Sequence, residues 1–196
     1  MTVKEVFDLR RQGKIEEAYE AIRPMYAVHR GKYTTLCMFW TARDILMKRL
    51  YEQRLDEAEK IFGALMRVLP NVEDDDGRAR SAMLQGALKL SQESQTFRML
   101  DFVEHGGMSL LGPADWQPFT MQDGRELPST AQRMLERCFY ELLLRPSVEQ
   151  ALKVMPLLEE SVKRFPGSKD NEGYLDIVRR IMEAGEKELA GKSCAQ

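Results

Sequence analysis

The chain contains only two histidines, and neither has neighbours in a spacing typical of catalysis or metal binding. His29 and His105 each lie at the predicted end of a helix, where a protonated imidazole interacts favourably with the helix dipole. Neither His-x-x-x-His nor Cys-x-x-Cys, two spacings that hold zinc, occurs in the sequence. We therefore predict no metal site and no bound cofactor.

Other residues whose side chains could take part in a reaction also lack the neighbours that the reaction would need. The sequence has neither a Gly-x-x-x-x-Gly-Lys loop nor a Gly-x-Gly-x-x-Gly turn, so the usual phosphate-binding loops are absent. The acidic run 74–76 before Gly77 lacks the later glutamate of a calcium-binding loop and reads as a solvated turn. Ser109 and Ser129 have no base nearby in the sequence. These observations predict a protein that is not an enzyme, with no catalytic residue.

What remains are the aromatic, methionine and arginine side chains that dominate binding energy at protein interfaces. Four of them, in a predicted helix over 33–53, are spaced three and four apart and share one stripe. Others follow Phe7 or lie in a proline-rich loop. The candidate partner-binding residues are Arg10, Arg11, Trp40, Arg43, Met47, Tyr51, Trp116 and Phe119. A structural role is the alternative to partner binding for two of these pairs. Trp40 and Met47 could belong to the core, and Trp116 and Phe119 could anchor their loop to the body of the protein.

Composition is that of a helical protein without membrane segments. The 196 residues carry a formal net charge of −2, which gives no overall bias toward nucleic acid. No run of about eighteen apolar residues is present, and the charged residues 1–13 do not resemble a signal peptide. Three widely separated cysteines argue against a disulfide framework. We expect a cytoplasmic protein of a bacterial-type cell that does not interact with membranes.

Three short segments of the chain are versions of one another. Each places an alanine (Ala18, Ala58 or Ala151) three residues after an apolar residue, with bulky apolar residues four and seven positions later. A small residue among large ones at this spacing marks a helix face that a neighbouring helix approaches closely. Recurrence at intervals of tens of residues predicts stacked helical hairpins.

The positions of glycine, proline and polar turns divide the chain into these hairpins. We predict one domain over 1–190 with an inserted loop or β-hairpin over 106–129, near 108–128, where Asp123-Gly124 favours a turn. A disordered tail is expected over 191–196. The predicted hairpins are 2–28, 33–69, 78–105 and 130–164, followed by a capping helix over 171–190.

The repeated pattern resembles tetratricopeptide repeats. Leu55-Asp56-Glu57-Ala58 followed by Phe62, Leu65 and Pro70 is the best match, although the spacing from Ala18 to Ala58 exceeds the usual period of roughly 34 residues. The resemblance implies an all-α fold of antiparallel hairpins stacked as a short solenoid. It also implies that the first helix of each pair lines a concave, partner-binding side.

A fainter likeness lies in the segment 116–129. It is similar to a hairpin of longer bacterial proteins that join such repeats to a nucleic-acid-binding barrel, and no such barrel is present in this sequence. The likeness supplies an alternative function, a nucleic-acid-associated accessory module of a bacterial mobile element or defence system.

The favoured hypothesis is a non-enzymatic protein-interaction scaffold that holds an acidic or C-terminal peptide of a partner. Arg10, Arg11 and Arg43 would pair with carboxylates, and Met47 and Tyr51 would bury apolar anchors. Besides nucleic-acid association, a homo-oligomerisation module remains an alternative, in which exposed helix faces meet across a two-fold axis.

Overall fold

A computed structural model describes the chain over residues 1–193, with side chains over residues 1–187. Its described part divides into two compact units, and the division falls between Phe97 and Arg98. The sequence predicted one domain over 1–190 with a hairpin over 78–105. The division falls inside that predicted hairpin, so its two helices belong to different units, and each unit is described by itself.

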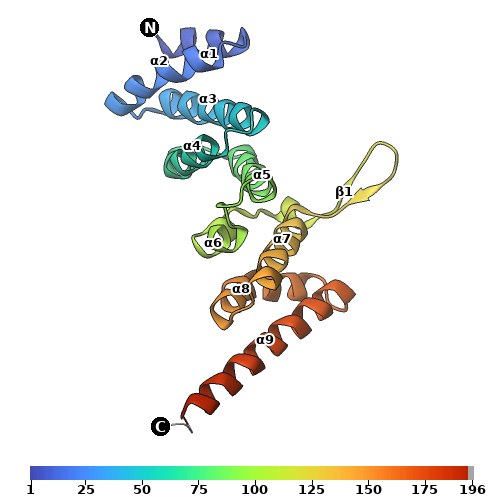
Figure 1. Cartoon of the computed structure of the whole chain (residues 1–196). Helices are drawn as coiled ribbons and strands as arrows, with labels where there is room; N and C mark the ends of the chain where they lie inside the picture. Colours follow the sequence, from blue (N-terminus) through green and yellow to red (C-terminus); the bar gives the residue numbers. More distant parts are fainter. Residues whose placement is uncertain (194–196) are drawn as a thin grey trace. The chain divides into compact units, whose positions relative to one another are not determined.

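The first unit is a stack of helical hairpins (Figure 1). Each helix packs on the next, and α3 also contacts both α1 and α5, which is the arrangement expected of consecutive stacked pairs. A short 3-10 turn over Leu69–Asn71 follows α4. The helices of this unit are α1 (Val3–Arg11), α2 (Ile15–Val28), α3 (Lys32–Tyr51), α4 (Leu55–Val68) and α5 (Arg78–Glu93).

Local interactions fix where these helices begin. Thr2 and Glu5 form a reciprocal capping box at α1, in which each side chain accepts the other residue's backbone N–H. Asp74 accepts the backbone N–H groups of Ala79 and Arg80 at 2.8 and 2.9 Å, so this carboxylate caps α5. The acidic turn predicted over 74–76 thus has a structural role.

The repeated alanines lie where the sequence predicted them, in the contacts between helices. Ala18, Ala58 and Ala151 are all fully buried. Ile22 and Phe62, four residues after the first two alanines, are also buried. The prediction of an all-α fold built from antiparallel hairpins is confirmed.

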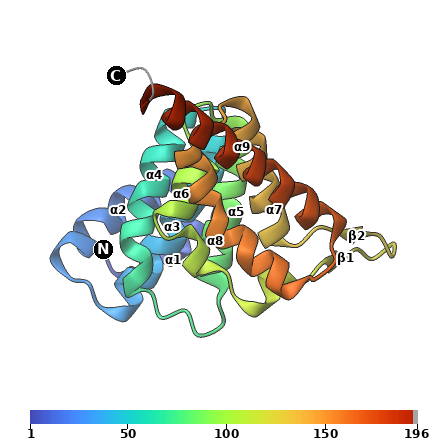
Figure 2. The same cartoon turned by 90° about the horizontal axis from the view of Figure 1, so that it is seen from below.

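The second unit contains the short helix α6, an irregular connection and the three longer helices α7, α8 and α9. Helix α6 (Met99–Glu104) packs on α7 (Thr130–Leu144) and α8 (Val148–Arg164), and α8 packs on α9 (Lys169–Ser193). The hairpin predicted over 130–164 is formed by α7 and α8, which Figure 2 shows beside α9. Helix α9 begins two residues before the predicted capping helix and continues through Ser193. Residues 194–196 of the predicted disordered tail lie outside the described part of the chain.

The connection between α6 and α7 contains the predicted β-hairpin. Two 3-10 turns, over Gly107–Leu110 and Pro113–Trp116, precede strands β1 (Phe119–Thr120) and β2 (Glu126–Leu127). The strands pair antiparallel, and Gly124 adopts a φ of 82° in the turn between them, a backbone conformation that favours glycine. The Asp-Gly signal therefore marked the turn correctly.

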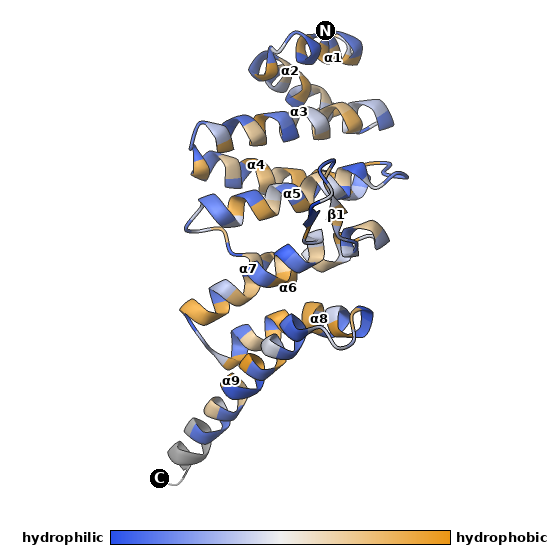
Figure 3. Ribbon diagram, turned by 90° about the vertical axis from the view of Figure 1, so that its right-hand side faces the viewer, coloured by the Kyte–Doolittle hydropathy of each residue, from blue (hydrophilic) through white to orange (hydrophobic). Residues whose placement is uncertain are grey.

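Hydrophobic and hydrophilic residues alternate along the helices, as on amphipathic helices that bury one face (Figure 3). Among the described residues, no helix combines the length and the apolar character that crossing a bilayer requires.

Candidate partner-binding groove

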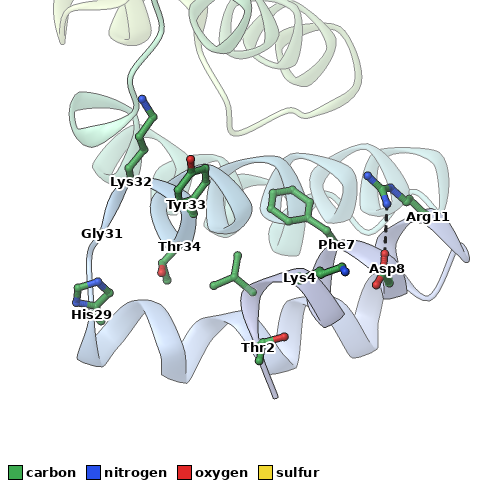
Figure 4. Close-up of a pocket in the computed structure, with 11 residues that line it drawn as sticks. Thr2, Lys4, Phe7, Asp8, Arg11, His29, Gly31, Lys32, Tyr33 and Thr34 are labelled. Atoms are coloured by element: carbon green, nitrogen blue, oxygen red, sulfur yellow. Dashed lines mark hydrogen bonds and ion pairs between the residues drawn. The ribbon is translucent and has the colours of Figure 1, made fainter.

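An open groove of about 620 Å³ lies between α1 and the beginning of α3 (Figure 4). We call it the α1–α3 groove. One wall comes from α1 and the residue before it, and the other from the end of the α2–α3 connection and the first turn of α3. The lining residues are Thr2, Val3, Lys4, Phe7, Asp8, Arg11, His29, Gly31, Lys32, Tyr33 and Thr34.

Part of the groove lining is apolar and includes two aromatic rings, those of Phe7 and Tyr33. Val3 and Phe7 are partly buried on α1, and Tyr33 on α3 is 68% exposed. Figure 4 shows Phe7 between the two helices, with Tyr33 and the buried Thr34 at the start of α3. Most of the Tyr33 side chain is therefore accessible from solvent.

Cationic side chains also line the groove. Lys4 makes no ion pair among the described residues, and Arg11 is 80% exposed with a single contact at 3.3 Å to Asp8. Because exposed ion pairs of this kind stabilise a fold little, Arg11 can exchange Asp8 for a carboxylate of a ligand at low cost. Lys32 also lines the groove, but its ammonium group is paired with Glu73, which does not belong to the lining. The groove therefore favours a ligand that combines apolar and acidic groups.

His29 and Gly31 line the end of the groove opposite Arg11 (Figure 4). The His29 ring lies against the backbone of Gly31, where a Cβ atom would stand only 2.5 Å from His29 Nε2. Any larger residue at position 31 would displace the imidazole. Glycine at this position thus allows the α2–α3 connection to pass close under the ring.

Of the sequence-predicted residues, Arg11 alone lines the groove. Arg10 instead faces α3, where its Nε and Nη2 atoms donate to Asp44 Oδ2 at 3.0 and 2.6 Å. Arg43 also contacts Asp44, through Nη1 and Oδ1 at 3.4 Å. The carboxylate of Asp44 is therefore shared by two of the three arginines that were predicted to bind a partner, and Arg10 joins two helices of its own chain.

The predicted stripe on α3 is exposed toward its C-terminal end. Met47 is 36% exposed and Tyr51 is 90% exposed. Trp40 is partly buried, and its ring packs edge-to-face on Phe39 with centroids 5.2 Å apart. Tyr33 is the residue that sequence reasoning missed. It stands seven positions before Trp40, two helical turns earlier, so extending the stripe toward the N-terminus would have found it.

The two aromatic residues of the inserted segment have different environments. Trp116 is only 4% exposed, and the Arg164 guanidinium stacks over its ring at 4.7 Å. Trp116 thus anchors the inserted segment to α8. Its buried ring does not support the prediction that Trp116 contacts a partner. Phe119 is 62% exposed and pairs across the ribbon with Leu127.

The described titratable side chains were compared with the geometry of metal sites and activated thiols. No group of three or more histidine, cysteine, aspartate or glutamate side chains among the described residues is placed to hold a metal ion. Burial raises the pKa of both the Cys37 and the Cys138 thiols, so neither is an activated nucleophile.

Comparison with protein-family models, with curated proteins and with solved structures finds no match to this chain.

Proposed function

We propose that the protein is a non-enzymatic adaptor that binds a peptide or helical segment of a partner protein in the α1–α3 groove. The observation that carries this proposal is the combination of a 68% exposed Tyr33 with a partly buried Phe7 in the lining of a groove of about 620 Å³. Amphipathic helices and peptides of partner proteins commonly place their apolar side chains in hydrophobic grooves. The resemblance to tetratricopeptide repeats points to the same role.

The charges of the groove select the kind of segment. Lys4 and Arg11 belong to the lining together with Val3 and Phe7, and Asp8 is the one carboxylate in it. A segment with an aromatic or aliphatic anchor, and with a carboxylate one or two residues from it, satisfies both features. Arg43 and Tyr51 lie on α3 beyond the lining, so they extend the surface only for a longer ligand.

We also propose a cytoplasmic location. Its support is that Cys37 and Cys138 are buried free thiols, which suit a reducing compartment.

Selection from a random-peptide display library tests the function. We expect enrichment of peptides with an apolar anchor next to Asp or Glu, and a binding loss of at least tenfold for Tyr33→Ser and for Lys4→Glu. Arg23→Glu is the control, because Arg23 is exposed on α2 outside the groove and pairs with Glu20 at 3.4 Å. Selected peptides that bind all variants equally would reject the groove.

Single-stranded RNA and DNA provide the counter-test. We expect no binding at low salt, since Asp8 and Glu73 accompany the cations of this region. Binding that falls steeply with salt and is lost in Lys4→Glu would assign the surface to phosphate groups instead.

A further inference from the structure

Helix α8 presents one exposed leucine to two hollows in the surface of the second unit. Leu152 is 53% exposed and belongs to the lining of both. One hollow, which we call the α6–α8 hollow, has a volume of about 530 Å³, and the other, the α8–α9 hollow, has a volume of about 290 Å³. An apolar side chain of another molecule can therefore pack on Leu152 in each hollow.

The two hollows share the character of grooves between packed helices, which accept the side-chain ridge of a further helix. Methionines line both, and their flexible thioethers adapt to the shape of a ligand. Besides Leu152, the apolar lining residues are Val103, Met108 and Pro156 in the α6–α8 hollow and Met155, Val178 and Met182 in the α8–α9 hollow.

The α6–α8 hollow carries more negative than positive charge. The Lys153 ammonium lies 3.2 Å from Asp101 Oδ1, 2.9 Å from Glu104 Oε2 and 3.4 Å from Glu149 Oε1, so one cation faces three carboxylates. Lys153 is only 17% exposed, whereas Asp101 and Glu104 are partly exposed and Glu149 is 81% exposed. A ligand that arrives from solvent therefore meets the carboxylates rather than the ammonium.

The other cationic side chains of this region leave the excess of acid in place. His105 Nδ1 lies 3.9 Å from Glu104 Oε2, and its imidazole adds positive charge only when protonated. Arg98 is directed to other partners, since its guanidinium donates to Gln150 Oε1 at 3.0 Å and lies 3.9 Å from Glu141 Oε2. Neither His105 nor Arg98 belongs to the lining of the hollow.

The α8–α9 hollow has the same sign of charge. Its lining contains Arg179 together with Glu183 and Glu186. The next arginine of α9, Arg180, pairs with Asp176 at 2.6 Å and lies outside the lining. The two linings together therefore hold four glutamates against one lysine and one arginine.

Pro156 adds a backbone acceptor to this surface. It lies inside α8 and has no N–H, so the Leu152 carbonyl lacks the donor that a regular helix gives it. Ammonium and guanidinium groups donate hydrogen bonds and accept none. The carboxylates and this carbonyl thus suit the same kind of group, a lysine or arginine side chain.

From these features we infer that the two hollows bind a basic amphipathic helix of a partner protein. Two apolar side chains of that helix, four positions apart on one face, would pack on Leu152, one in each hollow. Lysines or arginines beside them would pair with Glu104 and Glu149. This surface lies wholly in the second unit and selects the opposite charge from the α1–α3 groove, so the inference goes beyond the proposed function and does not depend on it.

A matched pair of peptides tests the inference on the full chain. One is a fluorescein-labelled, helix-forming peptide of about fifteen residues with leucines at i and i+4 and lysines beside them; in the other, glutamines replace the lysines. Fluorescence anisotropy at low salt should show the lysine peptide binding at least tenfold more tightly, with a difference that shrinks as salt is added. Equal binding of the two peptides, or binding of neither, would overturn the inference.

Variants locate the binding. Leu152→Ser and Glu149→Lys should each weaken the lysine peptide at least tenfold, and both change exposed side chains, so thermal melting should stay as in the parent. Leu143→Ser and Glu126→Lys are the matched controls, because both residues are exposed in the second unit outside the two linings. Losses of affinity no greater than those of the controls would contradict the proposed site.

Two further results would assign the binding elsewhere. Tyr33→Ser should leave the lysine peptide unaffected, and a loss confined to Tyr33→Ser would place this peptide in the α1–α3 groove and overturn the inference. Light scattering at high concentration should report no dimer that depends on Leu152. A dimer that Leu152→Ser abolishes would assign the surface to a second copy of this chain and would equally overturn it.

Discussion

Arg10 and Asp44 join the first and third helices through two hydrogen bonds to a single carboxylate oxygen, at 3.0 and 2.6 Å. Both side chains are about four-fifths shielded from solvent, with exposed fractions of 20% and 23%. Charge-assisted bonds with this much shielding stabilise a fold more than surface pairs do. This pair therefore holds α1 at its place against α3 and, with it, the wall of the α1–α3 groove.

Removal of this carboxylate should destabilise the first unit. We expect Asp44→Ala to lower the free energy of unfolding by about 1–2 kcal/mol, because it leaves the Arg10 guanidinium without its partner. Glu20→Ala removes an exposed ion pair with Arg23 and should change the free energy of unfolding by less than about 0.5 kcal/mol. Urea unfolding in a Trp116→Phe background measures this, since the fluorescence of Trp40 then reports on the first unit alone. Equal effects of the two variants would contradict the structural role of the pair.

The buried alanines should not tolerate a larger side chain. Ala58→Leu places three more carbon atoms in a fully packed contact and should destabilise the first unit by about 1–3 kcal/mol. Ala27→Leu makes the same change at an exposed position of α2 and should be nearly neutral. The same Trp40 fluorescence assay compares them. If Ala58→Leu were as stable as Ala27→Leu, close approach of helices at the repeated alanine would be disproved.

Glu141 gives the second unit a pH dependence of known sign. Burial raises the pKa of Glu141 above its ordinary value, while the amides of Met99 and Leu100 and the nearby Arg137 and Arg98 oppose the shift. A carboxyl group whose folded pKa is raised keeps its proton in the folded state at pH values where the unfolded chain has released it. Its contribution to stability is therefore greatest below the ordinary pKa of about 4.3 and is lost as the pH rises through the folded value.

The Glu141→Gln variant isolates this effect, because glutamine does not titrate. In a Trp40→Phe background, which leaves Trp116 as the reporter of the second unit, the stability of Glu141→Gln relative to the parent should increase as the pH rises from 4 to 7. A constant difference across this range would show that the amides and arginines cancel the effect of burial, and a difference of the opposite sign would show that they outweigh it.

Helices and their pairing were predictable where the period of apolar residues was strong. The alanine-centred segments located α2, α4 and α8, because a small residue among large apolar ones at helical spacing indicates a helix face packed closely on a neighbouring helix. The packing of α6 on α7 and α8 was not predictable, and the sequence instead suggested a hairpin of α6 with α5. Helix α6 is only six residues long, and its position depends on a carboxylate 41 residues away, Glu141, which accepts its first backbone N–H groups.

The candidate site was only partly predictable for a related reason. Arginines at helical spacing look alike in a sequence, but Arg10 is engaged by Asp44 whereas Arg11 remains exposed. Arg49 shows the same limit. It contacts Glu16 of α2, Glu57 of α4 and Glu52, the C-cap residue of α3. Which acid meets which arginine depends on helix packing between distant segments, and apolar periodicity does not encode it.

The most direct test of the proposed function is an amide chemical-shift map of the isotope-labelled protein titrated with a peptide from the display selection. We predict that the largest changes fall at residues 2–11 and 29–34, that the Tyr33→Ser protein shows none at the same peptide concentration, and that Arg23→Glu behaves as the parent. Changes confined to other helices would contradict the α1–α3 groove as the partner-binding site.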